Sequence, residues 1–195
     1  MPKIVDRAER RREIADALLR LVATGGVEAV SVRSVAAEAG VSAGAVQKYF
    51  STKEELFRFA LDLTGEFVEQ RWTQIDYTGN LLEVLIRLVA ETLPLDEQRR
   101  AESIVISAFT ARAAVRPSWT DFVREGYDEL HDLTVRFLDV AREAGHVRTD
   151  LPAGRLADIV IALGDGFANR MLTCEDPHAL QDSLTLALRE LLAPR

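Results

Sequence analysis

The sequence predicts an all-α protein of about nine helices, in which a short N-terminal three-helix unit precedes a larger helical region. Three observations predict this class. Apolar residues recur at helical spacing along nearly the whole chain, and no segment shows the alternation of a half-buried strand. Leu, Ala and Val dominate the 195 residues, whereas Gly and Pro number only 11 and 6. Each apolar segment also begins or ends at Pro, Gly, Asp or Ser.

The first three predicted helices are separated by residues that start or stop helices. Apolar residues share one face of a first helix over about residues 7–24, which Gly25 ends. Ser31 can cap a second helix that ends at Gly40, because a serine hydroxyl accepts a hydrogen bond from the free N–H groups of a helix start. The third helix covers residues 42–50 and also begins at a serine.

A longer fourth helix begins where Thr52 and Glu55 form the pattern of a capping box. Its apolar residues keep helical spacing as far as Trp72, so it should reach the mid-seventies and lead the chain out of the first unit. Gly79 and Asn80 end it. The remaining predicted helices cover residues 80–93, 96–114, 118–143, 153–173 and 177–193.

Charge is unevenly spread along the chain. The net charge is -7, but residues 1–50 carry eight Lys and Arg against six Asp and Glu, a balance of +2, so the remainder carries -9. DNA is bound mainly by cations that neutralise its phosphates, which makes the first quarter of the chain the candidate contact region. The alternative is a solvated helix face, and charge alone does not decide between the two.

Several classes of protein are disfavoured by composition. Cys174 is the single cysteine, which cannot form an internal disulfide, and no Cys/His spacing resembles a zinc site. No apolar core follows the basic N-terminal residues, and no apolar run is long enough to span a bilayer. We therefore expect a cytoplasmic protein with no metal and no cofactor.

The segment at residues 31–50 matches the requirements of a helix-turn-helix. That motif needs a small residue where two short helices cross, a glycine in the turn and an apolar residue that fixes the second helix to the core. Ala36, Gly40 and Val46 supply these in order. The alternative is an ordinary helical hairpin. The side chains left to face outward or flank that face are Arg33, Ser42, Ala43, Gly44, Gln47, Lys48 and Tyr49.

The stretch from Ile14 through "SVRSVAAEAGVSAGAVQKYFSTKEELF" strongly resembles the DNA-binding domain of the tetracycline-repressor (TetR) family of bacterial transcription regulators. The resemblance covers about residues 7–60. A weaker likeness in "AREAGHVRTDLPAGRLADIVIALGDGF" matches the penultimate-helix region of that family, and "LPLDEQRRAESIVISAFTARA" is similar to the branch of the choline-responsive regulator BetI. The implied division is a helix-turn-helix DNA-binding domain at residues 1–52 and a helical ligand-binding and dimerisation domain at residues 53–195.

The resemblance implies a homodimer in which each helix at residues 42–50 enters one major groove of a palindromic operator. It assigns phosphate contacts to Ser42, Tyr49 and Lys53, and base or groove contacts to Ala43, Gly44 and Lys48. Arg33 is a further expected contact position.

One position departs from the family pattern. Gln47 stands where the family most often has tyrosine, and glutamine can pair bidentately with adenine. The short side chains of Ala43, Gly44 and Ala45 cannot form hydrogen bonds with base edges, so direct readout should be sparse. We therefore expect affinity to depend on phosphate contacts and groove shape.

The basic N-terminal residues have two possible roles. Lys3, Arg10, Arg11 and Arg12 could contact phosphates or the minor groove, or they could keep a frayed terminus soluble.

The helices after residue 60 carry more apolar and aromatic surface than one packed stripe needs, which is compatible with a ligand cavity. Aromatic residues at helical spacing are more often core residues, and that alternative stays open for each one. By resemblance the pocket lies among the middle helices. The candidate ligand-binding residues combine an apolar body or a scaffold position with a polar tip, or line that region: Trp72, Phe109, Trp119, Tyr127, His131 and Asn169.

The last two helices are candidates for a dimer interface. Residues 156–167 are apolar on more than one side, and the final helix carries a continuous leucine stripe. One face could cover the core while the other meets a partner in a four-helix interface, or both could be buried within one subunit. The predicted interface residues are Leu156, Val160, Leu163, Gly164, Phe167, Leu180, Leu184, Leu188 and Leu191.

These observations predict a regulator of transcription, a repressor that a small apolar or amphipathic effector releases from DNA. Bound effector would shift the helix that begins at Lys53 and change the separation of the two recognition helices. The alternative is a DNA-binding regulator without a small-molecule ligand, controlled by a partner protein or by abundance. An enzyme is disfavoured, because Ser107, His131 and Asp165 fall on separate predicted helices with no catalytic motif around them.

Overall fold

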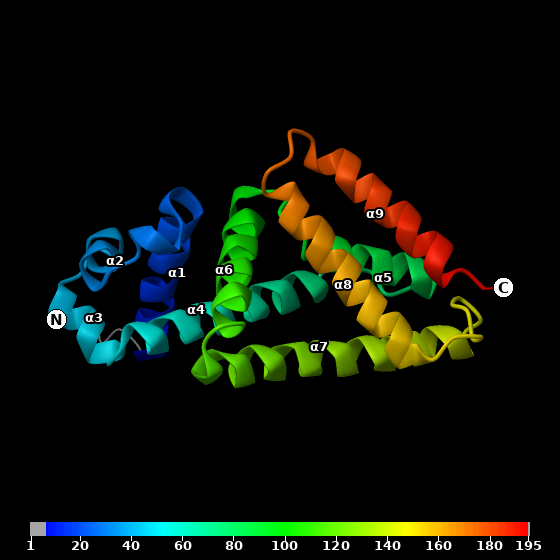
Figure 1. The fold of residues 1–195 in the computed structure, drawn as a ribbon, viewed down its shortest axis with the longest axis horizontal. Helices are drawn as coiled ribbons and strands as arrows, with labels where there is room; N and C mark the ends of the chain where they lie inside the picture. Colours follow the sequence, from blue (N-terminus) through cyan, green and yellow to red (C-terminus); the bar gives the residue numbers. More distant parts are fainter. Residues whose placement is uncertain (1–6, 195) are drawn as a thin grey trace.

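The computed structural model describes residues 7–194, and this part of the chain folds into nine α-helices and one short 3-10 helix, with no strand (Figure 1). The all-α class predicted from sequence is therefore confirmed. The helices are α1 (Arg7–Gly25), η1 (Val27–Ala29), α2 (Val32–Glu38), α3 (Ala43–Tyr49), α4 (Lys53–Trp72), α5 (Leu81–Ala90), α6 (Glu97–Ala113), α7 (Pro117–Glu143), α8 (Ala153–Met171) and α9 (Pro177–Leu192).

The helix boundaries follow the capping residues identified in the sequence. Ser42, Thr52 and Asp96 each accept a hydrogen bond from the backbone N–H three residues later. Asn80 accepts one from the N–H of Leu82. The main differences are α5, which ends at residue 90 rather than 93, and the short η1, which the sequence did not predict.

Helices α1 to α3 form one end of an elongated molecule, and α4 leads from them toward the middle (Figure 1). At the other end α8 and α9 cross over α5 and α7. None of the described helices is long and apolar enough to cross a membrane.

Two hydrophobic cores hold these parts together. The second core joins α5, α7, α8 and α9 around fully buried leucines such as Leu138, Leu156 and Leu188. The first core contains the apolar faces of α1 to α4, including Ile14, Leu18 and Val46, and it continues beyond the helix-turn-helix into α6 and the start of α7.

Three aromatic rings contribute to this continuation, together with the buried Val105 and Ala113 of α6. The ring centroids of Phe57 on α4 and Phe109 on α6 are 5.6 Å apart, and those of Phe109 and Trp119 on α7 are 4.9 Å apart, edge to face. All three side chains are buried. Edge-to-face aromatic pairs at such distances add to the stabilisation from burial. The helix-turn-helix is therefore packed directly onto the larger helical region.

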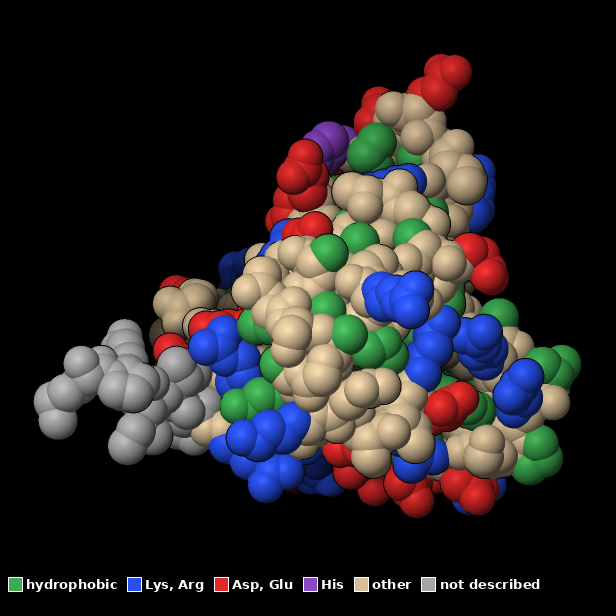
Figure 2. Space-filling model, turned by 90° about the vertical axis from the view of Figure 1, so that its left-hand side faces the viewer, with side chains coloured by type: hydrophobic (Ala, Val, Ile, Leu, Met, Phe, Trp, Pro, Cys, Tyr) green, Lys and Arg blue, Asp and Glu red, His purple; other side chains and the backbone are tan. Residues whose placement is uncertain are grey.

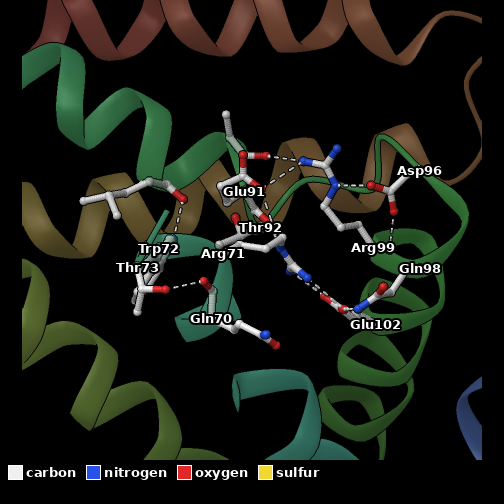
Figure 3. Close-up of polar contacts among 12 residues, drawn as sticks. Gln70, Arg71, Trp72, Thr73, Glu91, Thr92, Asp96, Gln98, Arg99 and Glu102 are labelled. Atoms are coloured by element: carbon white, nitrogen blue, oxygen red, sulfur yellow. Dashed lines mark hydrogen bonds and ion pairs between the residues drawn. The ribbon is translucent and has the colours of Figure 1, made fainter. Parts of the chain in front are cut away.

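A polar network fixes the far end of α4 (Figure 3). The Arg71 guanidinium donates to both carboxylate oxygens of Glu102 on α6, at 2.6 and 3.0 Å, and to the backbone carbonyl of Glu91 at 3.1 Å. Glu102 is only 3% exposed. Arg99 reaches the Glu91 carboxylate at 3.4 Å and the Asp96 carboxylate at 2.7 Å. Arg71 on α4 and Glu102 on α6 thus neutralise each other where α4 meets α5 and α6.

We predict that Arg71→Ala lowers the free energy of unfolding by about 3–5 kcal/mol, because it leaves the buried Glu102 carboxylate without its counter-ion. Urea unfolding monitored by circular dichroism measures this change. Arg189→Ala is the matched control, because it removes a bidentate pair with Glu83 at the surface, where little is lost. The double variant Arg71→Met/Glu102→Leu should recover most of the loss. A loss in Arg71→Ala no larger than in the control would contradict the prediction.

Candidate nucleic-acid interface and effector groove

The first helix of the helix-turn-helix is held at its start by two serines. The Ser31 hydroxyl accepts from the backbone N–H of Ser34 at 3.0 Å, and the Ser34 hydroxyl accepts from the N–H of Ser31 at 2.8 Å. The Ser34 hydroxyl also donates to the carbonyl of Ala29 at 2.8 Å. These bonds satisfy N–H groups that a helix start leaves free, and they fix α2 to the segment before it.

Gly40 makes the turn between α2 and α3 possible. Its φ of +66° lies in the left-handed region, where a residue with a Cβ atom is strained. The turn allows the N–H of Val41 to reach the carbonyl of Ala36 at 2.9 Å. Ala36 is 4% exposed, in agreement with a small residue at the crossing of the two helices. The predicted helix-turn-helix is therefore present.

Helix α3 is fixed by one buried apolar residue. Val46 is 1% exposed and belongs to the first core, which leaves the opposite side of the helix open. Among the predicted DNA-contacting residues, Ser42, Gly44, Gln47 and Lys48 on or beside α3 are exposed. Ala43 and Tyr49 are half-buried, and Arg33 on α2 is exposed. Each of these residues therefore lies on or next to the outward side of the two helices.

Two cations on this surface are available to a ligand. Within residues 7–194, the Arg33 guanidinium and the Lys48 ammonium have no ion pair or hydrogen bond inside the protein. Figure 2 views the molecule from this end and shows Lys and Arg side chains spread among uncharged and acidic ones. Free cations beside an exposed short helix give a surface on which phosphates can be neutralised.

Other predicted basic contacts are engaged inside the protein. Lys53 donates from Nζ to the carbonyl of Val30 at 2.6 Å, so only its remaining N–H groups can reach a phosphate. Arg10 pairs with Glu13, and Arg12 pairs with Glu66.

Arg11 has a structural role. Its guanidinium lies 4.5 Å from the Phe50 ring centroid and 4.7 Å from that of Phe59, and it pairs with Glu55 at 3.3 Å. Arg10, Arg11 and Arg12 thus belong to α1 rather than to a frayed arm. Lys3 lies outside the described residues.

An open groove of about 380 Å³ lies between α7 and α8. It brings together two of the six predicted ligand-binding residues, Tyr127 and His131. The other residues that line it are Asp128, Asp158, Ile161, Ala162 and Asp165.

A hydrogen bond joins the two walls of the groove. The Tyr127 hydroxyl donates to Oδ2 of Asp165 at 2.7 Å. Burial, and then the neighbouring Asp165 carboxylate, raises the pKa of Tyr127 to about 12. Burial also raises the pKa of Asp165, against the opposite effect of the hydrogen bond from Tyr127. The groove therefore presents a carboxylate that water solvates poorly and that a bound cation would stabilise.

His131 lies further along the same groove. Its Nε2 is 3.3 Å from the carbonyl of Gly154 and 3.5 Å from Oδ1 of Asp158, and its Nδ1 is 3.7 Å from Oδ1 of Asp132. The imidazole is half-buried, so one side of it faces the open space.

The other four predicted ligand-binding residues do not line this groove. Phe109 and Trp119 are buried in the first core. The Trp72 indole N–H donates to the carbonyl of Leu88 at 2.9 Å beside the Arg71 network (Figure 3). Asn169 accepts a hydrogen bond from the Ser107 hydroxyl at 2.7 Å and is exposed on α8. Phe109, Trp72 and Asn169 thus make packing or helix contacts, whereas Trp119 also lines a second hollow.

The predicted interface residues of α8 and α9 are unevenly exposed. Leu156, Val160, Leu184 and Leu188 are 0–3% exposed, because the second core of the same chain already covers them. A Cβ atom on Gly164 would lie 3.8 Å from Val89, so this glycine faces α5. The half-buried members of the set are Leu163, Gly164, Phe167, Leu180 and Leu191.

Two exposed residues that sequence reasoning missed carry the outward apolar surface of these helices. Ile159 on α8 is 39% exposed and Leu186 on α9 is 61% exposed. Both interrupt the inward-facing stripes that helical spacing identifies. An apolar residue out of phase with such a stripe is the sequence signal that could have found them.

Two family models match the chain. The model of bacterial regulatory proteins of the tetR family matches residues 14–59, and that of the C-terminal part of BetI-type transcriptional repressors matches residues 82–193.

Individual relatives agree with the family matches. The HTH-type transcriptional regulator PksA of Bacillus subtilis is 34% identical over 170 residues, which cover 86% of this chain and 81% of PksA. The repressor KstR2 of Mycobacterium tuberculosis is 27% identical over 143 residues, covering 73% of this chain and 71% of KstR2.

Solved structures show the same fold. A transcriptional regulator from Rhodococcus sp. Rha1 superposes with a TM-score of 0.81 at 32% identity, covering 93% of this chain and 95% of that one. A regulator from Saccharomonospora viridis in complex with choline superposes with a TM-score of 0.81 at 24% identity, covering 96% and 100%. The chain thus belongs to the tetR family of bacterial regulatory proteins, and it is a transcriptional repressor of that type rather than an enzyme.

Proposed function

We propose that the protein binds a palindromic operator as a homodimer and that a small amphipathic effector releases it. The observation that carries this proposal is the outward side of α2 and α3, where a glutamine and two unpaired cations surround a short helix fixed from behind by Val46. A helix presented in this way fits the width of the major groove.

The contacts that we assign follow from side-chain chemistry. Lys48 and Arg33 have free charges, and we assign both to phosphate oxygens, which for Lys48 replaces the base or groove contact that the family resemblance implies. Ser42 and Tyr49 add hydroxyls to this surface. Ala43 and Gly44 allow the backbone to approach the groove closely. Lys53 contributes its remaining N–H groups. Gln47 is exposed and has both a donor and an acceptor, so we assign base readout to it.

The proposed dimer uses α8 and α9. Ile159 and Leu186 expose large apolar side chains on these two helices, while the opposite faces of the helices cover the second core. Two copies packed face to face would bury both residues in a four-helix interface. A two-fold axis there would carry two α3 helices, which must lie about 34–36 Å apart to enter successive major grooves.

The proposed effector site is the groove between α7 and α8. Its three carboxylates, Asp128, Asp158 and Asp165, favour a ligand with a positive charge, and the Tyr127 ring and Ile161 favour an apolar body. The structurally similar regulator from Saccharomonospora viridis was solved with choline, a small quaternary ammonium. We therefore propose an organic cation as the effector class.

The proposed coupling runs through the first core. Effector binding would shift α7, whose Trp119 contacts Phe109 on α6, and Phe109 contacts Phe57 near the start of α4. The start of α4 follows α3 directly. We propose that the DNA-binding and effector-binding domains, which divide near residue 52, differ in role but do not pack as separate units, because the first core continues across the boundary. Linkage requires the effector to bind the DNA-bound form more weakly than the free form.

We predict that Gln47→Ala weakens binding to an operator fragment, selected from random duplexes, by about 1–3 kcal/mol, the range lost with one bidentate base contact. Binding to random duplex should change little. Fluorescence anisotropy titrations of both duplexes measure the difference. Equal weakening on operator and random DNA would show that Gln47 does not read a base.

Lys48→Ala should instead weaken both duplexes and reduce the slope of log affinity against log salt by about 1, because one phosphate contact is lost. The matched control is Arg155→Ala, which removes a highly exposed cation at the start of α8, far from α3. An unchanged slope in Lys48→Ala, or the same reduction in the control, would remove Lys48 from the interface.

We predict that choline raises the thermal unfolding temperature of the free protein, whereas its uncharged tert-butyl analogue does not. Differential scanning fluorimetry measures both. The double variant Asp158→Asn/Asp165→Asn should lose the choline shift, because the carboxylates that attract the cation are gone, while Asp182→Asn on the exposed side of α9 should keep it. Equal shifts with the two compounds, or no shift with choline, would contradict a cationic effector and favour a regulator controlled by a partner protein or by abundance.

A further inference from the structure

A second, smaller hollow lies where the DNA-binding helices meet the larger helical region. It has a volume of about 130 Å³ and is formed by the start of α4, the end of α6 and the start of α7. Its wall contains the buried rings of Phe57 and Trp119, two members of the aromatic contact that joins these helices. The residues that line it are Lys53, Glu54, Phe57, Arg112, Arg116 and Trp119.

The charges around this hollow are unbalanced. Lys53, Arg112 and Arg116 face a single lining carboxylate, Glu54. In the described part of the chain, the guanidinium groups of Arg112 and Arg116 form no ion pair and no hydrogen bond with the protein. Lys53 donates to the carbonyl of Val30 and keeps two further N–H groups. Three cations therefore line the hollow, whereas most other described arginines have partners within the protein. The hollow thus carries more positive charge and more hydrogen-bond donors than its one carboxylate can satisfy.

Two helix starts add to the positive potential. Helices α4 and α7 both begin at the hollow, and the N-cap of α7, Arg116, makes no side-chain capping bond. Pro117 at the start of α7 has no N–H and Thr52 already caps α4, so the contribution is that of the helix dipoles, which favour a negative charge nearby. This contribution is secondary to the two unpaired guanidinium groups, whose fork geometry matches that of an oxyanion.

We propose that this hollow binds a phosphate group, held by Arg112 and Arg116 against the Trp119 ring, with a further contact from Lys53 when DNA does not engage its remaining N–H groups. A volume of about 130 Å³ is sufficient for one tetrahedral oxyanion. The site differs from the groove between α7 and α8 in place and in sign of charge, because that groove is lined by carboxylates.

The hollow lies between the DNA-binding helices and the larger helical region, so a ligand bound in it contacts both. Lys53 is the first residue of α4, three residues after Phe50, the C-cap of α3, whereas Arg112 belongs to α6 and Arg116 is the N-cap of α7. A bound phosphate group would therefore tie the DNA-binding helices to the larger region. If the protein works as proposed above, occupancy would favour one separation of the two recognition helices.

Intrinsic fluorescence tests the binding without any DNA. The chain contains two tryptophans, Trp72 and Trp119, so the variant Trp72→Phe reports on the hollow alone. Inorganic phosphate should change the Trp119 emission in a saturable way, whereas potassium chloride at matched ionic strength should not. Isothermal titration calorimetry on the unsubstituted protein gives the dissociation constant independently.

Variants of the two unpaired arginines decide the assignment. Arg112→Ala and Arg116→Ala should each weaken phosphate binding about tenfold or more, because each removes a charge-assisted hydrogen bond. Arg136→Ala, which removes an exposed arginine elsewhere on α7, should leave it unchanged. Thermal unfolding checks that each variant folds, and Arg112→Gln replaces any that does not. Equal responses to phosphate and chloride, or unchanged binding in both arginine variants, would overturn the proposal.

A second arm identifies the source of the phosphate group. If a free phosphate compound occupies the hollow, Arg112→Ala/Arg116→Ala should bind duplex DNA normally in phosphate-free buffer. If the DNA backbone supplies the group, the same variant should show a smaller salt slope, and inorganic phosphate should compete with the duplex. If phosphate does not bind to the protein without DNA, the proposed phosphate site is wrong. If the protein does not bind DNA, only the proposed function is contradicted.

Discussion

The contact of Phe57, Phe109 and Trp119 is the interaction on which the rest of the structure depends. It places one buried ring from each of α4, α6 and α7 in the first core, beside the residues that hold the helix-turn-helix. A DNA-binding unit of about fifty residues has little apolar surface of its own, and small units bury a small share of their surface on folding. Packing onto α6 and α7 supplies the missing burial. The same contact makes the position of the reading helix depend on the larger region.

This dependence suits a regulator with two states. Close-packed cores do not deform continuously, so a displacement of α7 is either absorbed by rearrangement of side chains or passed to the start of α4. The far end of α4 is less free to respond, because Arg71 holds it to the buried carboxylate of Glu102 (Figure 3). If effector binding moves α7 as proposed above, α4 can pivot about this fixed end. Of the two hollows described above, one lies between α7 and α8 and is lined by carboxylates, and the other lies beside Phe57 and Trp119 and is lined mainly by cations.

Local features of the fold could be predicted from sequence, and long-range ones could not. Ala36, Gly40 and Val46 define the helix-turn-helix because their roles depend on spacing within one short segment, and the structure and family matches confirm the motif. Phe109 shows the limit: its helical spacing cannot tell whether the ring faces a cavity or a core, since that depends on Phe57 and Trp119 from other helices. The same limit applies to the leucine stripes of α8 and α9, where periodicity marks an apolar face but does not say which chain covers it. For the hollow beside Trp119, the sequence indicated Lys53 as a phosphate contact and Trp119 as a ligand candidate, but it did not indicate Arg112 and Arg116, because these residues come together with Lys53 only in the folded chain.

The central claim is that α3 is the helix that reads DNA and that a two-fold axis presents it twice. Repeated selection of random duplexes by the purified chain, followed by sequencing, tests this claim most directly. We expect enrichment of a palindrome whose half-site centres are separated by about 10–10.5 base pairs or a multiple of that spacing. Recovery of no preferred sequence, or of a single motif without two-fold symmetry, would contradict it.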